Sequence, residues 1–318
     1  MKVGIIGAGS IAGTMAGTIR EMDCAQNYAV AARDYGRAAE FAQTYGFEKA
    51  YGSYEELVED AGVELVYIAT PHSHHYEHIK LCLNHGKHVL CEKSFTVNES
   101  QAREVLALAR EKKLLLTEAI WTRYMPMRKT LDSVLSSGVI GRPYMLTANL
   151  GYIISGKERI MRPELAGGAL LDVGIYPLNF ASMVFGDEVD SITGTAVMTE
   201  TGVDAQNSIT ITYKDGKMAA LCSSAMGLSD RRGIIYGDNG FIEVENINNC
   251  EGIRVYDRSR NMIASYDTPK QISGYEYEVE ACLRAIKEGA LECPEMPHEE
   301  TLRMMGWMDE LRRQWGLV

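Results

Sequence analysis

Apolar and polar positions alternate in blocks along the first 120 residues, where short apolar runs are followed by stretches with helical spacing. The apolar runs predict strands at residues 3–6, 28–32, 65–69, 87–90 and 114–117. The amphipathic stretches predict helices that begin near residue 11 and at residues 37–45, 54–59, 74–84 and about 102–109. Strands that alternate with helices in this way predict a parallel, doubly wound sheet of the α/β class.

Beyond about residue 142 the pattern changes. Residues 208–213 alternate polar and apolar side chains, and Asp215-Gly216 and Asn239-Gly240 are typical of hairpin turns. An α+β domain with a mainly antiparallel open sheet is the simplest interpretation. Helical spacing returns near residues 279–286 and 302–311. We therefore expect two domains, residues 1–122 and residues 123–318.

The first predicted strand runs directly into Gly-x-Gly-x-x-Ala, a sequence that suits the pyrophosphate of a dinucleotide. Gly7 permits a tight turn, Gly9 lets the backbone approach the phosphates, and Ala12 lets the next helix pack close to the strand. The helix N-terminus then offers N–H groups to the anion. The expected cofactor contacts here are Gly7, Gly9, Ser10, Ile11 and Ala12. The alternative is an ordinary strand-to-helix turn. The motif and its position predict a Rossmann domain.

The end of the second predicted strand indicates which dinucleotide is bound. NAD enzymes usually place a carboxylate here for the ribose hydroxyls. This chain instead has the small Ala32 followed by Arg33, with Arg37 one turn further on, which leaves room and positive charge for a 2′-phosphate. NADP is favoured. Asp34 is the competing observation, because a shift of the strand end by one residue would make it the ribose ligand and favour NAD. A further alternative is that Arg33 and Asp34 are a solvated pair in the loop without a role in nucleotide binding.

Two further predicted strands end in polar residues at the same edge of the sheet. Ligands of doubly wound sheets collect outside the C-terminal strand ends, so these residues are expected around the cofactor. They are Thr70, Pro71, His72, His75, Glu92 and Lys93. Lys93 is the leading catalytic candidate, its alternative being a surface lysine paired with Glu92. His74 and His78 share a helix face, but no third ligand joins them, so we expect no metal site.

Composition narrows the class of protein. The formal net charge of −11 argues against a general nucleic-acid surface, although a local positive patch for a cofactor phosphate remains compatible with it. No apolar run is long enough to cross a bilayer and no secretory signal precedes the first strand, so we expect a soluble, cytoplasmic protein without a membrane partner. The seven cysteines form no C-x-x-C pair and suit reduced thiols.

The chain resembles the family of glucose-fructose oxidoreductases and inositol dehydrogenases (Gfo/Idh/MocA) over nearly its full length. The resemblance rests on Ala69-Thr-Pro with His75 beyond it and on Glu92-Lys93. It extends through residues 118–126 (EAIWTRYMP) and 159–177, the latter containing Gly167-Gly168 and ending in Tyr176-Pro177. The stretch at 118–126 is similar to the branch that contains dimeric dihydrodiol dehydrogenase and NADP-linked xylose dehydrogenase. One departure is Ser94, where the family commonly has proline.

The resemblance implies catalytic roles. Lys93 matches the catalytic lysine, Asp172 its acidic partner, and Tyr176 the residue that transfers the proton. A helix over residues 168–180 would place Asp172 and Tyr176 on one face, because they are four residues apart. A nearby lysine ammonium stabilises a phenolate, so Tyr176 is able to accept the hydroxyl proton. The alternative is that Asp172 pairs structurally and Tyr176 is a core residue.

The resemblance also implies an activity and partners. We expect an NADP-dependent oxidoreductase that moves a hydride between the nicotinamide and a hydroxyl of a sugar, polyol or cyclic diol. Trp121, Arg123 and Arg159 are expected to contact substrate, although packing at a domain interface is the alternative for Trp121. Residues 123–318 would bind substrate and form a homodimer or homotetramer through the open sheet. Alternatives are a regulator of the same fold without turnover and a transferase that retains its nucleotide between two substrates.

Overall fold

The computed structural model describes all 318 residues, which fall into two compact units. Unit 1 consists of Met1–Tyr124 and Gln271–Met305, and unit 2 of Met125–Lys270 and Gly306–Val318. The structure thus differs from the single division predicted after residue 122, because residues 271–305 pack with the N-terminal unit. Two hydrogen bonds join this segment to Leu116 of the N-terminal unit: the Leu116 N–H donates to the Leu291 carbonyl, and the His298 ring contacts the Leu116 carbonyl.

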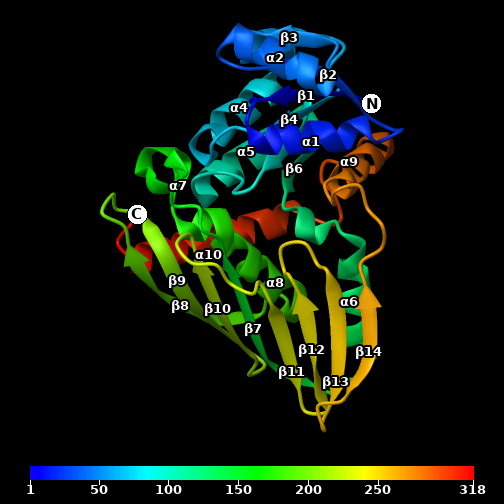
Figure 1. The fold of residues 1–318 in the computed structure, drawn as a ribbon. Helices are drawn as coiled ribbons and strands as arrows, with labels where there is room; N and C mark the ends of the chain where they lie inside the picture. The colour runs from blue at the N-terminus through cyan, green and yellow to red at the C-terminus, as the bar shows by residue number, and fades with distance from the viewer. The chain divides into compact units, whose positions relative to one another are not determined.

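Unit 1 is built on a six-stranded parallel sheet with the strand order β3-β2-β1-β4-β5-β6 (Figure 1). Its strands are β1 (Lys2–Ile6), β2 (Gln26–Ala31), β3 (Lys49–Tyr51), β4 (Leu65–Ile68), β5 (His88–Glu92) and β6 (Leu116–Ala119). Its helices are α1 (Ser10–Arg20), α2 (Tyr35–Tyr45), α3 (Tyr54–Glu59), α4 (His72–Asn84), α5 (Glu99–Lys112), the short 3-10 helix η1 (Trp121–Arg123) and α9 (Glu276–Glu288). The doubly wound Rossmann prediction is confirmed. The strand order reverses between β1 and β4, where such sheets bind ligands.

Unit 2 contains an eight-stranded sheet with the order β14-β13-β12-β11-β7-β10-β9-β8. Its strands are β7 (Pro143–Gly151), β8 (Val189–Met198), β9 (Asp204–Tyr213), β10 (Met218–Ser224), β11 (Gly233–Gly237), β12 (Gly240–Glu245), β13 (Gly252–Asp257) and β14 (Met262–Asp267). All neighbours are antiparallel except β7 and β10. The predicted hairpin turns at Asp215-Gly216 and Asn239-Gly240 join β9 to β10 and β11 to β12, which confirms the mainly antiparallel sheet.

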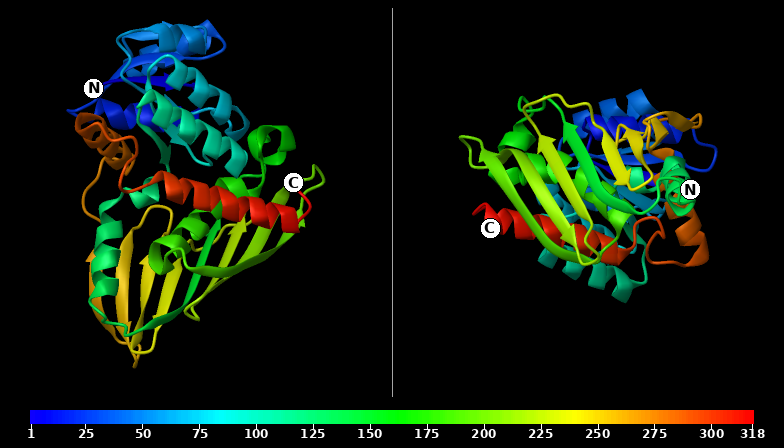
Figure 2. Two further views of the ribbon diagram at one scale, coloured as in Figure 1. Left: turned by 180° about the vertical axis from the view of Figure 1, so that it is seen from behind. Right: turned by 90° about the horizontal axis from the view of Figure 1, so that it is seen from below.

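Helices cover one face of this sheet and leave the other without a helix (Figure 2). The helical elements of unit 2 are α6 (Pro126–Ser136), α7 (Glu158–Met161), the 3-10 helix η2 (Pro163–Leu165), the π-helical turn Leu170–Gly174 (hereafter the π-turn), α8 (Ile175–Phe185) and the C-terminal part of α10 (His298–Gln314). The π-turn and α8 pack on β7, β9 and β10.

One stretch of unit 2 contradicts the expectation that no apolar run is long enough to cross a bilayer. The stretch Pro163–Phe185, which contains η2, the π-turn and α8, has 23 residues and is long and apolar enough to cross a bilayer, although 89% of its most apolar window is buried inside the protein. Such burial is typical of the core helix of a folded domain. The stretch was missed because Asp172 and two prolines interrupt its apolar sequence. All seven cysteines are free thiols, as predicted.

Candidate active site

The predicted site residues fall into two groups, one in each unit. In unit 1, the glycine loop leaves β1 at Gly7, whose φ of +104° favours glycine. A Cβ at Gly7 would lie 2.8 Å from the Ala69 carbonyl oxygen, so the loop also needs glycine here for space. A Cβ at Gly9 would meet no atom within 4 Å, which leaves open space at the start of α1. This cradle fits the phosphates of a dinucleotide.

The second strand end carries the predicted arginines. The Arg37 guanidinium donates to the Ala8 carbonyl of the glycine loop at 2.8 Å, so its charge lies beside that loop. The Asp34 carboxylate accepts the Arg37 backbone N–H at 2.7 Å and caps α2. Ala32 is buried and Arg33 is exposed. One oxygen of Asp34 is therefore engaged in capping, while both arginines remain close to solvent.

His75, predicted as a cofactor contact, has no solvent exposure and joins two strand-end loops. Its Nδ1 lies 2.9 Å from the Ser94 carbonyl oxygen and its Nε2 lies 2.8 Å from that of Thr70. Burial lowers the pKa of His75 to about 4, so the ring is neutral at pH 7 and donates one of these two hydrogen bonds. His75 thus joins the loop after β4 to the loop after β5, and its contact with the cofactor stays a prediction.

Other polar residues of this edge surround α4. The Thr70 hydroxyl lies 3.0 Å from His78 Nδ1, and burial, then the neighbouring histidines and Arg33, lower the pKa of His78 to about 4. His72 is buried at the first position of α4, directly after Pro71. The imidazole of His78 is therefore neutral at pH 7.

Lys93 follows β5 and is half-buried, and its peptide bond to Ser94 is cis. The preceding residue, Glu92, is buried and accepts a hydrogen bond from the Tyr67 hydroxyl. Burial, and after it the charge of Glu92, raises the pKa of Tyr67 well above its usual value, so Tyr67 remains the donor. The sequence placed Glu92 and Lys93 at the strand end as the structure does, but it did not reveal Tyr67.

Glu92 belongs to a buried carboxyl cluster that the sequence did not predict, formed with Glu118 and Glu278. Burial raises the pKa of Glu118 to about 7, against the opposing effects of the Thr301 hydroxyl and the Phe95 N–H. Burial, followed by the charge of Glu92, raises the pKa of Glu278 well above its usual range, and neither carboxylate oxygen of Glu278 has a hydrogen-bond partner. The pattern offered one weak signal, since Glu118 interrupts an otherwise apolar strand end.

Two residues predicted to contact substrate have partners within unit 1. The Trp121 ring stacks on Tyr275 with 4.2 Å between the ring centroids. Arg123 forms a largely buried ion pair with Glu300. These contacts favour the packing alternative for Trp121, and a substrate contact of either residue stays a prediction.

In unit 2, the predicted helix over residues 168–180 begins as the π-turn and continues as α8. Such turns are rare in proteins, and those that occur are often found at functional sites. Asp172 lies in the π-turn, is almost fully buried and accepts a hydrogen bond from the Arg159 guanidinium at 2.7 Å. Tyr176 is buried in the first turn of α8. The structure therefore brings Arg159 to Asp172, a pairing that the sequence did not predict.

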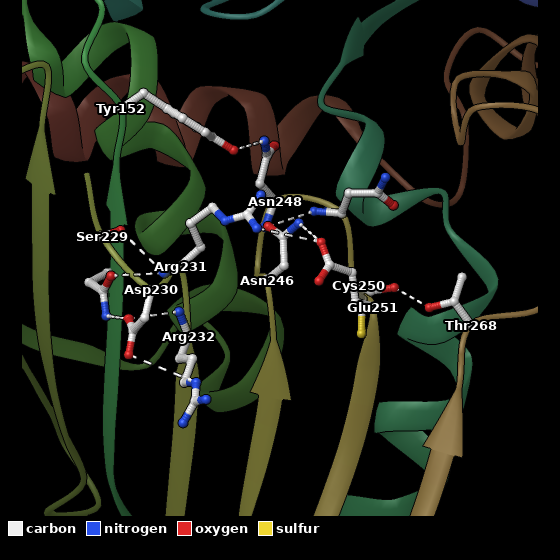
Figure 3. Close-up of polar contacts among 12 residues, drawn as sticks. Tyr152, Ser229, Asp230, Arg231, Arg232, Asn246, Asn248, Cys250, Glu251 and Thr268 are labelled. Atoms are coloured by element: carbon white, nitrogen blue, oxygen red, sulfur yellow. Dashed lines mark hydrogen bonds and ion pairs between the residues drawn. The ribbon is translucent and has the colours of Figure 1, made fainter. Parts of the chain in front are cut away.

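A second polar network of unit 2 joins the loop before β11 to the loop after β12 (Figure 3). The Arg231 N–H donates to the Asn149 side-chain oxygen at 3.2 Å, and the Arg231 guanidinium lies 3.6 Å from Glu251. The Asn246 amide also donates to Glu251, at 2.8 Å, and the Asn248 amide donates to the Tyr152 hydroxyl at 3.0 Å. These side chains satisfy one another, so the network holds the loops together.

A six-stranded doubly wound sheet with an open glycine cradle is typical of a dinucleotide-binding domain, and comparison with known proteins identifies the family. Residues 1–120 match the profile of the oxidoreductase family with an NAD-binding Rossmann fold, and residues 129–243 match the GFO/IDH/MocA C-terminal domain. The chain belongs to the Gfo/Idh/MocA family of oxidoreductases. The resemblance seen in the sequence is confirmed.

Relatives and solved structures agree with this assignment. The chain is 35% identical over 327 residues to a human trans-1,2-dihydrobenzene-1,2-diol dehydrogenase, covering 100% of this chain and 98% of that protein. A Xenopus tropicalis dehydrogenase of the same name is 33% identical over 325 residues, with the same coverage. KijD10, a 3-ketoreductase from Actinomadura kijaniata solved with NADP and TDP-benzene, has the same fold, with a TM-score of 0.91, 24% identity and coverage of 99% and 97%. The chain is an NAD(P)-dependent dehydrogenase acting on CH–OH groups.

Proposed function

We propose that this dehydrogenase uses NADP to oxidise a hydroxyl of a cyclic diol, sugar or polyol. The substrate class is supported by the names of the relatives, which act on trans-1,2-dihydrobenzene-1,2-diol. Vicinal hydroxyl groups are common to that diol and to sugars and polyols. Location in the cytoplasm stays a prediction.

One observation carries the choice of NADP over NAD. Asp34, the competing ribose ligand, is engaged as the cap of α2, whereas Arg37 lies against the glycine loop and Arg33 is exposed beside it in sequence. Guanidinium groups bind phosphate through charge-assisted hydrogen bonds, which a 2′-hydroxyl without phosphate does not offer. The solved structure of KijD10 that shares this fold contains NADP.

The proposed chemistry assigns one proton and one electron pair to separate acceptors. When bound, NADP supplies the oxidant that accepts the hydride from the alcohol carbon. Tyr176 accepts the hydroxyl proton as its phenolate, and the Lys93 ammonium stabilises the negative charge that develops on the substrate oxygen. Asp172 holds the Arg159 guanidinium, so this pair is proposed to orient a second hydroxyl of the substrate. The carbon–oxygen single bond becomes a carbonyl, and a proton is released overall.

Steady-state oxidation tests this proposal. The purified protein is mixed with NADP or NAD and with trans-dihydrodiols, aldoses and inositols, and formation of reduced nicotinamide is followed by absorbance. We expect turnover with NADP on at least one compound and a decrease in kcat of about 10²- to 10⁴-fold in Lys93→Met and in Tyr176→Phe. Lys112→Met, on the exposed face of α5, is the matched control and should retain activity.

Two outcomes would contradict the proposal. Full activity in Tyr176→Phe would remove Tyr176 from proton transfer. Tight binding of NADP without turnover of any compound, in wild type and variants alike, would favour the regulator of the same fold.

Oligomerisation through the uncovered face of the unit 2 sheet is also part of the proposal. Large apolar side chains are exposed on this sheet and its loops, among them Val197, Met198, Met218, Met226, Leu228, Met262 and Ile263. A hollow of about 400 Å³ lies across β7, β8, β9 and β10, with Thr195, Gln206 and Cys222 in its lining. Exposed apolar side chains on a sheet face without helices support a partner there, and a second copy of the chain is the partner we propose.

A further inference from the structure

Asp204, at the start of β9, lies beneath the π-turn of unit 2. Asp204 is buried, with only 3% of its surface exposed. Its Oδ2 accepts a hydrogen bond from the Leu170 N–H, the first amide of the π-turn, at 2.7 Å. The same oxygen accepts a hydrogen bond from the Asn207 side-chain amide at 2.9 Å. The first amides of a helical segment have no partner within the helix, so a carboxylate placed here satisfies one of them with a charge-assisted bond.

The backbone that enters the π-turn is shaped to admit this carboxylate. Gly168 has a φ of +105°, and a Cβ there would lie 2.2 Å from Asp204 Oδ1. The Gly168 N–H donates to the Ile160 carbonyl at 2.8 Å, which fixes the same residue from the other side. A side chain at position 168 would thus displace Asp204 or the chain.

The same polar network reaches the other end of the π-turn. The Ser223 hydroxyl donates to the Asn207 side-chain oxygen at 2.8 Å, and a Cβ on Gly174 would lie 3.0 Å from that hydroxyl oxygen. Burial raises the pKa of Asp204, while its hydrogen bonds and the Arg312 charge act in the opposite direction. Asp204 therefore binds the first amide of the turn that carries Asp172, and Ser223, which is joined to Asp204 through Asn207, lies beside the last residue of that turn.

We infer that Asp204 is a positioning residue for the catalytic segment, holding the π-turn so that Asp172 meets Arg159 and Tyr176 follows in the correct orientation. The inference rests on the proposed roles of Asp172 and Tyr176. The Asp204 carboxylate accepts hydrogen bonds from the Leu170 N–H and the Asn207 amide, so it acts through the turn. Reaction rates depend steeply on the orientation of catalytic groups, which makes kcat the sensitive measurement.

Three variants test the inference. Asp204→Ala removes the acceptor from Leu170 N–H and should lower kcat by about 10- to 100-fold. Asp204→Asn keeps an oxygen that accepts the same N–H and should retain kcat within about threefold. The Kd of NADP, measured by fluorescence titration, should not change in either variant, because the nucleotide loop lies in unit 1. Asp190→Ala, an exposed aspartate in the adjacent strand β8, is the matched control and should behave as wild type.

A double variant separates positioning from general destabilisation. In single-turnover reactions, adding Asp204→Ala to Tyr176→Phe should lower the rate by a much smaller factor than Asp204→Ala lowers it in the wild-type protein. The reason is that the hydroxyl of Tyr176, which Asp204 helps to position, is already absent. The inference would be overturned if the rate decrease of the double variant equalled the product of the decreases of the two single variants. A kcat for Asp204→Ala within threefold of wild type would also overturn it. If Asp204→Ala gives no folded protein, Ser223→Ala decides: a decrease in kcat of about 3- to 10-fold with unchanged NADP Kd supports positioning, and unchanged kcat overturns it.

Failure of the proposed function would give a different result. If Tyr176→Phe alone retains full activity, Tyr176 is not the proton acceptor, and the effect of Asp204→Ala on kcat then has to be explained through another residue. The two hypotheses are thus decided by different variants.

Discussion

At the scale of single residues, Glu118 connects burial to the pH dependence of stability. Burial raises its pKa to about 7, whereas an unfolded chain leaves a glutamate near 4.3. The protonated carboxyl is therefore favoured by the fold, and its stabilising contribution is fully present below about pH 4.3 and is lost as the pH rises through about 7. Over this window the contribution lost is on the order of 3 kcal/mol.

Substitution of Glu118 by glutamine should remove this dependence. The free energy of unfolding of Glu118→Gln, measured with urea at pH 5 and at pH 8, should improve relative to wild type as the pH rises. Glu111→Gln, exposed on α5, serves as the control and should show no such trend. A constant difference between Glu118→Gln and wild type across the pH range would show that Glu118 is ionised in the folded protein.

The arginines after β2 carry a second prediction at this scale. Replacement of Arg37 by alanine removes a guanidinium beside the glycine loop, so the Kd of NADP should rise by about 10- to 100-fold while the Kd of NAD changes little. Fluorescence titration of both nucleotides measures the two constants. Equal weakening of both would mean that Arg37 supports the loop through Ala8 and does not bind the 2′-phosphate.

Sequence was informative about residues that follow strand ends and uninformative about residues that meet across the fold. Glu92 and Lys93 were predicted because they follow an apolar strand, and Tyr176 because a family motif contains it. Glu278 was not found, because only folding brings α9, more than 150 residues later in the chain, to the sheet of unit 1. Arg159 and Asp172 were both named, but their pairing needed the geometry of the π-turn.

At the scale of elements, variants of Asp34 distinguish its role as the cap of α2 from a role in binding the ribose of NAD. The Asp34 carboxylate accepts the Arg37 N–H, so Asp34→Ala should lower the free energy of unfolding by about 1 kcal/mol. Asp34→Asn caps nearly as well and should cost little. Because the proposed preference for NADP comes from Arg33 and Arg37, both variants should keep it. A selective loss of NAD binding in Asp34→Asn would instead assign Asp34 to the ribose.

Most elements could be predicted because their apolar periodicity differs between strands and helices. The π-turn could not, since a widened turn changes the hydrogen-bond pattern without leaving a distinct apolar spacing over residues 170–174. Its signature lies instead in Gly168 and Asp204, which are 36 residues apart and meet only in the folded unit. Local pattern thus predicts that a helix forms, and long-range contacts decide how it begins.

At the scale of the whole molecule, the order of strands was only partly predictable. The six-stranded sheet followed from regular alternation of strands and helices, which leaves few arrangements of a doubly wound fold. The eight-stranded sheet pairs β7 with β10 and β11, which come more than 60 residues later, and a hairpin pattern cannot reveal such pairs. The return of residues 271–305 to unit 1 escaped prediction for the same reason.

The uncovered face of this second sheet leads to a prediction about assembly. Val197 is 57% exposed on β8, beside the hollow lined by Thr195 and Gln206. If a second copy covers this face, Val197→Glu places an unpaired charge in an apolar contact, and its desolvation weakens the oligomer at least tenfold, or about 1.4 kcal/mol. Light scattering coupled to gel filtration over a range of protein concentrations measures the shift toward monomer.

A matched charge on the other unit makes the result specific. Gln43→Glu adds the same charge to the exposed surface of α2 and should leave the oligomer intact. The Kd of NADP should be unchanged in both variants, because the glycine loop and the arginines that follow β2 all lie in unit 1. A wild-type protein that stays monomeric at micromolar concentration, or a Val197→Glu oligomer as stable as wild type, would mean that this face binds something other than a second copy.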